Sequence, residues 1–452
     1  MAERRSEKSI AIVGAGFTGL TAAYELVKNG VDVTIYESSN DLGGLAGGFK
    51  MCGAPLEKTY HFIYKTDKHM FALLKELKLY HLLKFHKSSV STYYGNNLYS
   101  MMSPKDLMMF KPLKLRNRIR AGLVVLYLQH LKNWKQLTNI TALEWLEKYA
   151  GKEVTDIIWK PLLKGKFDKY YDKITMCWLW GRIKQRADSQ DISKGGEVLG
   201  YIEGGFQVII DTLLSKIEHK AKLKMNTPVS SIYFNNESKR IVLETNNEKT
   251  EYNKILLTIP SKTASKILAP YKNEAYFQKL RSIDYLDAVV LVFATEQNIS
   301  KYYWHNINSK NSPFVVFIGL TNLIGNKNFN GKNIYYIGDY VPRDHQYIGL
   351  SEDELKEHWF NQLKLIFPKF DKKYITNSRL FKFKDAQHIV DVGFEEKIPD
   401  TKTPFNNIYL SNFSQIFPMD RGTNYAVRDG LKVAKIMLES EDCNYGKNQE
   451  LQ

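Results

Sequence analysis

Cysteine and long apolar runs are both scarce in this chain. Its 452 residues include three cysteines, Cys52, Cys177 and Cys443, which lie far apart and form no CxxC pair. Neither a disulfide framework nor a zinc site is indicated, and we predict no metal site. No apolar run reaches the roughly eighteen residues that a spanning helix needs. The charged segment Met1 to Lys8 leaves no room for a signal peptide, so we expect a cytoplasmic protein.

Acidic residues are too few to balance the basic ones. The chain has 64 Lys and Arg against 48 Asp and Glu, a formal net charge of +16, which favours anionic partners. The lysines are scattered through loop-like stretches such as Asn322 to Lys332, so we predict no nucleic-acid partner. Basic residues between Lys111 and Arg120 precede the apolar run Ala121 to Leu128. This arrangement is typical either of a helix on the anionic inner face of a membrane or of a buried helix with basic flanks.

The composition is otherwise that of a globular protein. Hydrophobic residues make up 44% and charged residues 25% of a chain that is too long for one ordinary core. At the amino end, an apolar run over Ser9 to Val13 is followed by a glycine turn, a helical pattern over Leu20 to Lys28 and a second apolar run over Val31 to Tyr36. This order predicts a strand, helix and strand of a parallel sheet.

The glycine turn carries a dinucleotide-binding fingerprint. In Gly14-Ala15-Gly16-Phe17-Thr18-Gly19, the first glycine permits a tight turn and the second a close approach to a pyrophosphate, while the third allows close helix packing. The helix that begins here directs free amides at the phosphates. Glu37 ends the second strand 18 residues past Gly19, where an acid accepts hydrogen bonds from the adenosine ribose. With the adjacent Ser38, these residues are the predicted adenosine diphosphate site.

The segment Asp41-Leu42-Gly43-Gly44-Leu45-Ala46-Gly47-Gly48 resembles a family. It is similar to the flavoprotein superfamily of amine oxidases, protoporphyrinogen oxidases, phytoene desaturases and UDP-galactopyranose mutase, in which a second glycine pair closes over FAD. The resemblance implies that Gly43, Gly44, Leu45 and Ala46 contact the cofactor. Many relatives have an arginine where this chain has Leu45, so that phosphate contact is absent or comes from elsewhere.

Further segments extend the resemblance into the middle of the chain. Thr59 to Asp67 resembles the histidine-bearing segment of UDP-galactopyranose mutase, which implies that His61 lies near the isoalloxazine, as an acid or base if its pKa is near neutrality or else as a packed histidine. Trp159 to Phe167, followed by Arg182, resembles the substrate lobe of protoporphyrinogen-oxidase-like proteins of glycan assembly. Arg182 is thereby a candidate catalytic or phosphate-binding residue, and Leu199 to Phe206 resembles the return into the FAD domain.

The last part of the chain resembles the second half of the same FAD site. Val229 corresponds to the residue whose backbone meets the adenine, and Asn412 stands where relatives have an aspartate. The start of the last helix would face the flavin pyrimidine, where amides stabilise negative charge. The residues implied there are Arg421, Gly422, Thr423, Asn424 and Val427.

Two departures from the amine oxidases narrow the chemistry. The segment Leu286 to Val292 has no lysine where those enzymes carry one, and their covalent-flavin cysteine motif is missing. The resemblance therefore implies FAD bound without a covalent link and makes amine oxidation less favoured. His388 precedes the final FAD segment and is either a residue of the substrate cavity or an ordinary loop histidine.

The predicted fold class is α/β, with a discontinuous Rossmann-like FAD-binding domain built on a parallel sheet. A mixed α+β substrate domain with a largely helical insertion completes it. The FAD domain is assigned residues 8–67, 199–265 and 401–440, the helical insertion 68–198, and the substrate-domain sheet and helices 266–400. No signal in the sequence sets the oligomeric state.

The leading functional hypothesis is an FAD-dependent oxidoreductase similar to protoporphyrinogen oxidase. It implies hydride transfer to or from flavin N5 on a bulky small-molecule substrate that is lipid-linked or contains a sugar. Two alternatives remain open. One is a sugar mutase or epimerase like UDP-galactopyranose mutase, without net redox, and the other is a non-enzymatic binding protein with the fold of the GDP-dissociation inhibitors.

Overall fold

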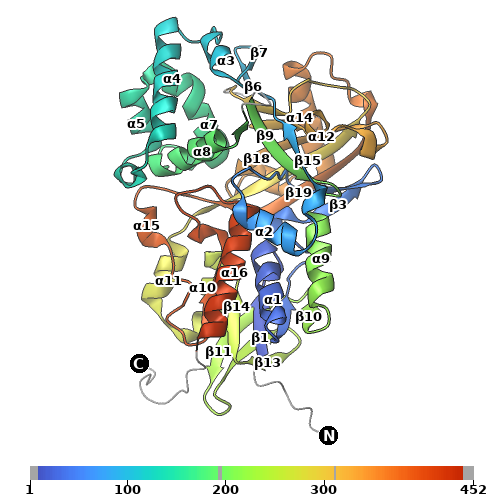
Figure 1. Ribbon diagram of the computed structural model, residues 1–452, viewed down its shortest axis with the longest axis vertical. Coiled ribbons are helices and arrows are strands. Elements are labelled where there is room, and N and C mark those ends of the chain that lie inside the picture. Colours follow the sequence, from blue (N-terminus) through green and yellow to red (C-terminus); the bar gives the residue numbers. More distant parts are fainter. Residues whose placement is uncertain (1–8, 192–195, 310–311, 441–452) are drawn as a thin grey trace.

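The computed structural model describes residues 9–191, 196–309 and 312–440. Figure 1 shows two lobes, one holding a parallel sheet flanked by helices and the other a mixed sheet beside a group of helices. The α/β class and the mixed second sheet confirm the expected fold. Within the described residues, no helix combines the length and the apolar character required to cross a bilayer.

The parallel sheet is assembled from stretches far apart in the chain. Its five strands lie in the order β10–β2–β1–β14–β20, and each neighbouring pair runs parallel. Because β1 and β2 come first in the sequence and β20 comes last, the sheet is discontinuous, as the sequence predicts. The strands are β1 (Ser9–Val13), β2 (Asp32–Tyr36), β10 (Ala221–Lys224), β14 (Lys254–Leu257) and β20 (Ile408–Leu410).

Three helices cover one face of this sheet, and α1 lies between the other two (Figure 1). They are α1 (Phe17–Lys28), α9 (Gln207–Ile217) and α16 (Thr423–Glu439). Gly430 of α16 lets it approach α1 closely, because a Cβ there would lie 2.6 Å from the Thr18 carbonyl oxygen. This crossing places the amino ends of α1 and α16 near each other. The opposite face carries β11 (Val229–Asn235), β12 (Arg240–Thr245), β13 (Lys249–Tyr252), α10 (Ser261–Ile267) and α11 (Glu274–Arg281), whereas α15 (Phe394–Lys397) packs through Phe394 with the helices around Trp178.

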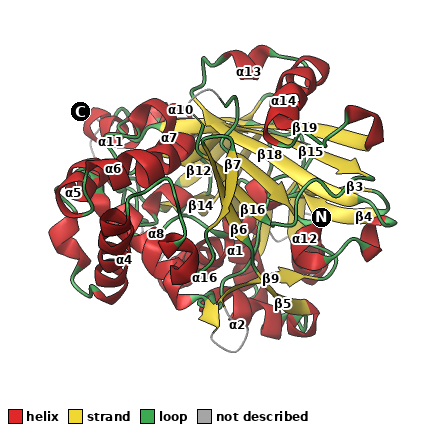
Figure 2. Ribbon diagram, turned by 90° about the horizontal axis from the view of Figure 1, so that it is seen from above, coloured by secondary structure: helices red, strands yellow, loops and turns green. Residues whose placement is uncertain are grey.

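The second lobe is built on a seven-stranded sheet in the order β19–β15–β18–β17–β16–β6–β7. All neighbours are antiparallel except β6 and β16. Strand β15 is buried at ten of its eleven positions, which explains its continuous apolar run, and α14 covers one face with Trp359 and Leu363 (Figure 2). The elements are β6 (Val90–Tyr94), β7 (Asn97–Ser100), β15 (Tyr285–Thr295), β16 (Trp304–Ile307), β17 (Val316–Gly319), β18 (Asn333–Val341), β19 (Ile375–His388), α12 (Thr321–Ile324), α13 (Gln346–Gly349) and α14 (Glu352–Ile366).

The remaining helices pack together around buried Trp178 and Phe167. They are α3 (Pro104–Met108), α4 (Leu115–His130), α5 (Ala142–Tyr149), α6 (Lys152–Val154), α7 (Lys160–Phe167) and α8 (Met176–Asp188). The stretch 68–198 is helical only in part, because β6 and β7 leave it to extend the mixed sheet and β5 pairs with β9. The elements that join the two lobes are β3 (Gly48–Met51), β4 (Ala54–Glu57), α2 (Lys68–Glu76), β5 (Leu83–Lys87), β8 (Gln190–Asp191) and β9 (Gly196–Ile202).

Candidate active site

Two glycines of the fingerprint are required by the chain itself. Gly14 has a φ of +107°, and a Cβ there would lie 2.6 Å from the Thr258 hydroxyl. A Cβ on Gly19 would lie 2.1 Å from the Gly14 carbonyl oxygen, so α1 can start this close to β1 only with glycine. Phe17 is buried against Phe206, and this packing fixes the first turn of the helix.

Two other glycines have no such structural reason. A Cβ on Gly16 or Gly422 would meet nothing within 4 Å, and neither residue has a positive φ. Each is the N-cap of a long helix, α1 or α16, and no side chain caps either helix. The amide donors of both first turns therefore face space that the protein leaves open, which is the arrangement that an anionic cofactor needs.

Glu37 lies beside the glycine loop, as the fingerprint predicts. Its Oε2 accepts the Ala15 amide at 2.9 Å, and its Oε1 accepts the amide of Ser39 at 3.0 Å. Thr227 donates its amide to the Glu37 carbonyl, so the lead-in to β11 and Val229 lies at the same edge of the sheet. Ser38 is exposed next to it. These residues surround the position expected for an adenosine ribose.

The second glycine pair packs on the first glycine loop. The Gly43 amide donates to the Ala15 carbonyl at 2.9 Å, and both Gly43 and Gly44 have positive φ. A Cβ on Gly44 would lie 3.3 Å from the Gly16 Cα, so this approach needs a residue without a side chain. The two glycine segments thus form one wall, with Ala46 buried behind it.

Asn412 and Asn424 serve the chain's own hydrogen bonding. The Asn412 amide donates to the Ile259 carbonyl at 2.8 Å and its oxygen accepts from Ser414, a pair of roles that the aspartate of relatives does not offer. The Asn424 oxygen accepts the amides of His69 and Met70, the free donors at the start of α2. Thr423 and Val427 are buried in the first two turns of α16.

A small cavity of about 50 Å³ brings three distant segments together. Leu45, His61 and Arg421 all contribute to its wall, as the resemblance implies for residues around the flavin ring. No separate signal in the sequence marks the other lining residues, which come from β15, β18, β19 and the two residues before His61. The wall includes Leu45, Tyr60, His61, Ala288, Tyr340 and Arg421.

His61 is a neutral histidine rather than one that titrates near neutrality. Burial lowers its pKa to about 4, so at pH 7 it carries no charge. Its Nδ1 lies 2.8 Å from the Thr59 carbonyl, which can only accept, so Nδ1 carries the hydrogen and Nε2 is left as an acceptor. His61 is therefore suited to accept a hydrogen bond in the site, and the expectation of an acid near neutral pH is not met.

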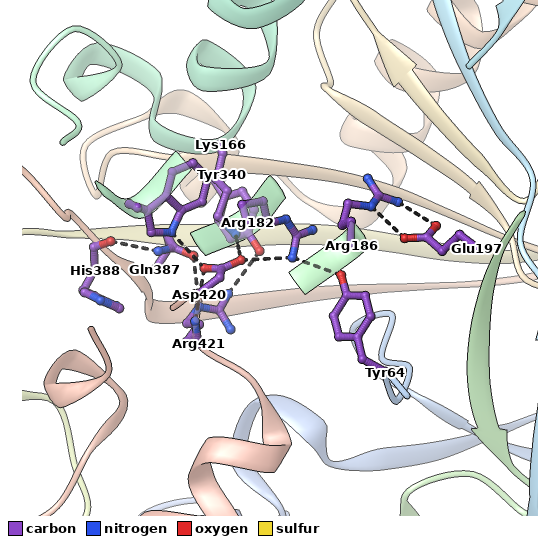
Figure 3. A network of polar contacts seen from close by, with 11 residues as sticks. Tyr64, Lys166, Arg182, Arg186, Glu197, Tyr340, Gln387, His388, Asp420 and Arg421 are labelled. Carbon is purple, nitrogen blue, oxygen red and sulfur yellow. Dashed lines mark hydrogen bonds and ion pairs between the residues drawn. The ribbon is translucent and has the colours of Figure 1, made fainter. Parts of the chain in front are cut away.

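The centre of the site is a buried carboxylate surrounded by cations (Figure 3). Asp420 is 4% exposed, and its carboxylate lies 3.0 Å from Lys166 Nζ and 3.3 Å from Arg182 Nη1. Trp178 Nε1 donates to the same carboxylate at 3.3 Å. Burial alone would raise the pKa of Asp420, but Lys166, Arg182 and Arg421 hold it well below its usual range. The carboxylate is thus charged at neutral pH.

Arg421 connects this cluster to the strands of the second lobe. Its Nε donates to Gln387 at 3.0 Å and its Nη2 to the Tyr340 hydroxyl at 3.1 Å. Burial would raise the pKa of Tyr340, yet Arg421 and Lys166 lower it. Tyr340 and Tyr60 had no distinguishing pattern in the sequence, although Tyr60 adjoins His61 in the segment that carried the resemblance.

A large cavity of about 400 Å³ lies against the small one. The two share Tyr60 and Tyr340, so these tyrosines stand at the junction between them. Lys166 and Arg182 line the large cavity, and Lys164, the other lysine of α7, is exposed over the ring of Tyr171.

His388 lies outside both of these cavities. Its side chain is packed between the rings of Phe394 and Phe413 at 5.4 and 5.5 Å. Neither ring nitrogen has a hydrogen-bond partner, and burial lowers its pKa to about 3. His388 thus ends strand β19 in the core as a neutral histidine, so the interpretation as a loop histidine is wrong, and His388 lines neither of these cavities.

The comparisons with known proteins agree with this geometry. The family model described as flavin containing amine oxidoreductase matches residues 17–437. The chain belongs to this family. The cofactor is FAD, and it is bound without a covalent link: the free cysteines of the described part, Cys52 and Cys177, lie outside the small cavity. The open amides at Gly16 and Gly422, together with Glu37, are the groups that would hold it.

The chain is also similar to curated proteins and has the fold of solved structures. Protoporphyrinogen oxidase 2 of Arabidopsis thaliana is 23% identical over 57% of this chain and 58% of its own, so the alignment spans less than two thirds of that enzyme. Coproporphyrinogen III oxidase of Staphylococcus aureus is 24% identical over 64% of this chain and 68% of its own. A structure from Exiguobacterium, proposed to be a protoporphyrinogen oxidase, has a TM-score of 0.77 at 17% identity and covers 96% of this chain and 100% of its own.

The contrast between the glycines leads to a first prediction. In Gly16→Val the new Cβ lies more than 4 Å from other protein atoms while the side chain occupies the approach to the phosphates, so we expect loss of bound FAD. The unfolding midpoint of the FAD-free protein should stay within a degree or so of the parent, because surface changes rarely exceed about 0.5 kcal/mol. The flavin absorbance of the purified protein and thermal unfolding measure the two effects. Gly349→Val, equally open but distant, is the control and should keep its flavin.

The buried histidine leads to a prediction on pH. Because the pKa of His388 is lowered to about 3, the unfolded chain takes up a proton at a higher pH than the folded chain does. Its contribution to stability is therefore complete above about pH 6.5 and is lost as the pH falls towards 3. Compared with the parent, His388→Phe should lose roughly 2 kcal/mol less of its unfolding free energy between about pH 7.5 and pH 5. Urea unfolding at both pH values tests this, and the exposed His219→Gln should behave as the parent does.

Proposed function

We propose that this protein is an FAD-dependent oxidoreductase that removes a hydride from a bulky substrate held in the large cavity. The observation that carries the proposal is the junction of the two cavities at Tyr60 and Tyr340. A substrate in the large cavity would there lie next to the small cavity, where the flavin ring is expected. FAD, when bound, supplies the acceptor for the hydride. The chain supplies the binding, the orientation and the proton transfer.

Tyr340 is the residue that we assign to proton transfer. When a hydride leaves a substrate, a neighbouring hydrogen leaves as a proton and needs a base. The Tyr340 hydroxyl stands at the junction, accepts a hydrogen bond from Arg421, and has a pKa lowered against burial by two cations. His61 is the weaker candidate, because its pKa of about 4 makes it a poor base at neutral pH.

The wall of the large cavity indicates the size and character of the substrate. Much of it is apolar and aromatic, with Phe110 and Val125 at one end and Trp159, Trp178 and Trp304 along its length. A cavity of about 400 Å³ suits a bulky molecule. The two curated relatives are named for porphyrinogens, which are also bulky, and one solved relative is a UDP-galactopyranose mutase, which supports a lipid-linked or sugar-containing substrate as a further candidate.

An exposed apolar face on α3 and α4 fits the surface of an anionic membrane. Leu115, Ile119, Leu123 and Leu126 form one stripe of α4, each between 48% and 62% exposed. The face continues with exposed Met102, Met108 and Met109 and is flanked by exposed basic residues at Lys105, Lys111, Lys114 and Arg116. Met102 also lines the large cavity. A bilayer on this face would therefore adjoin the entrance that a lipid-linked substrate needs.

An anaerobic flavin-reduction screen tests the proposed function. Candidate substrates are lipid-linked sugars, nucleotide sugars and porphyrinogens, each mixed with the FAD-loaded protein. Bleaching of the flavin absorbance with one equivalent of oxidised product per flavin is the expected result. Turnover that requires pre-reduced flavin and gives an isomer of the substrate would instead indicate a mutase, and protein that takes up no FAD would contradict both.

The role of Tyr340 leads to a third prediction. Tyr340→Phe removes the hydroxyl at the junction and should slow flavin reduction by about a hundredfold or more. The rise of the rate with pH that reports the deprotonated tyrosine should also disappear. Stopped-flow reduction at several pH values measures both. Tyr335→Phe, on the same strand with its side chain in the core on the other face, should change neither, and an unaltered rate in Tyr340→Phe would remove Tyr340 from the reaction.

The apolar face leads to a fourth prediction, on membrane binding. The protein should co-sediment at low salt with vesicles that contain anionic lipid and should not do so with neutral vesicles. Leu123→Glu combined with Leu126→Glu should lower the bound fraction by about tenfold or more, because two apolar contacts are replaced by charges of the wrong sign. Leu365→Glu, at an exposed position of α14, is the control. Equal sedimentation of the parent, the double variant and the control would contradict the assignment of this face.

A further inference from the structure

The inner end of the large cavity holds more positive than negative charge. Lys166, Arg182 and Arg421 surround a single carboxylate, Asp420, so the cluster has two positive charges beyond neutrality. The next cation along the wall, Arg186, is already matched by Glu197 through two hydrogen bonds of 2.9 and 3.1 Å. The excess therefore lies at the end of the cavity that adjoins Tyr60 and Tyr340.

The cations of this end keep unused donors. Both polar contacts of Arg182 within the described chain, to Asp420 and to Tyr64, pass through Nη1, which leaves Nε and Nη2 available. Lys166 has one carboxylate contact for its three hydrogens, and its side chain is 17% exposed against 22% for Arg182. Because both residues line the cavity, this exposed surface faces its interior.

The outer end of the same cavity is apolar. Phe110, Val125, Ile158 and Leu162 line it, and it reaches the surface at exposed Met102. The two ends of the cavity thus differ in character. The positive charges lie at the end next to Tyr60 and Tyr340, and the apolar surface lies at the end next to α3 and α4.

We propose that the large cavity binds an anionic amphiphile, whose phosphate or carboxylate head contacts Lys166 and Arg182 while its apolar chain lies towards Met102. The proposal deepens the proposed function, on which it rests, by naming the class of substrate. It also separates this chain from relatives that oxidise amines, because a cationic head group placed beside three cations would be repelled.

Ligand binding can be measured without turnover, because Trp159, Trp178 and Trp304 line the cavity. Their fluorescence is to be titrated, in the FAD-loaded protein and below micelle-forming concentrations, with four probes that share one chain: dodecyl phosphate, laurate, dodecanol and dodecylamine. The two anions should bind at least about tenfold more tightly than the alcohol, and the amine most weakly. A stronger response to dodecyl phosphate than to laurate would identify the head as a phosphate, and the reverse would identify a carboxylate. Equal binding of alcohol, amine and anions would overturn the proposal.

Variants that remove one positive charge each sharpen the test. Lys166→Gln and Arg182→Gln should each weaken binding of the preferred anion by about tenfold or more while dodecanol binds as before. Lys164→Gln on the same helix, whose side chain is exposed outside the cavity, is the matched control and should bind as the parent does. Unchanged binding of the preferred anion in both Lys166→Gln and Arg182→Gln would mean that these cations serve only to balance Asp420, and the proposal would fail.

The proposal and the proposed function fail separately. Tight anion binding without flavin reduction by any candidate would leave the binding site standing and contradict the oxidoreductase. Rapid flavin reduction by an uncharged amphiphile, with no preference for an anionic one, would support the oxidoreductase and overturn the anion site.

Discussion

The buried carboxylate of Asp420 is the constraint on which the arrangement of the site depends. A charge without a partner in a protein interior costs several kcal/mol, so Lys166 and Arg182 must turn inward to meet it. Their helices, α7 and α8, are thereby held against the segment that precedes α16. Since α16 packs on α1, which begins at the glycine loop, one charge cluster positions the wall of the large cavity relative to the cofactor side.

The same cluster sets the chemistry at the junction. Three cations around one carboxylate leave a positive field, and this field acts on Tyr340, which lies within reach of Arg421 and Lys166. It lowers the pKa of a phenol that burial alone would raise. It also opposes protonation of His61, on which burial already acts in the same direction. The positive field therefore gives the two residues different roles: it favours Tyr340 as the base and His61 as a neutral hydrogen-bonding group.

The cofactor half of the site was predictable from the sequence because its residues are constrained locally. The positive φ of Gly14, the packing of Gly19 and the position of Glu37 after β2 follow from one strand, turn and helix, so a short motif carries them. The substrate half was not predictable in this way. Tyr340 and Asp420 contact Arg421 and Trp178 across 80 residues of sequence or more. Contacts between such distant residues produce no short motif that could be recognised in the sequence. Strands β6 and β7 were also missed: they pair with each other, and only β6 joins them to the mixed sheet, through the distant β16.

This division explains why membership of the family fixes the cofactor and not the substrate. The groups expected to meet FAD are mainly backbone amides and glycines, which any member can retain while its side chains change. The large cavity is instead lined by side chains of α4, α7 and α8 and of the mixed sheet, none of which the glycine loops constrain. In this chain, β15 carries no lysine within Leu286–Val292, and the charge beside the flavin side comes instead from Lys166 and Arg182 of the helices. Lys166 and Arg182 face the large cavity from the side of the helices, where they would contact the head of the proposed anionic substrate.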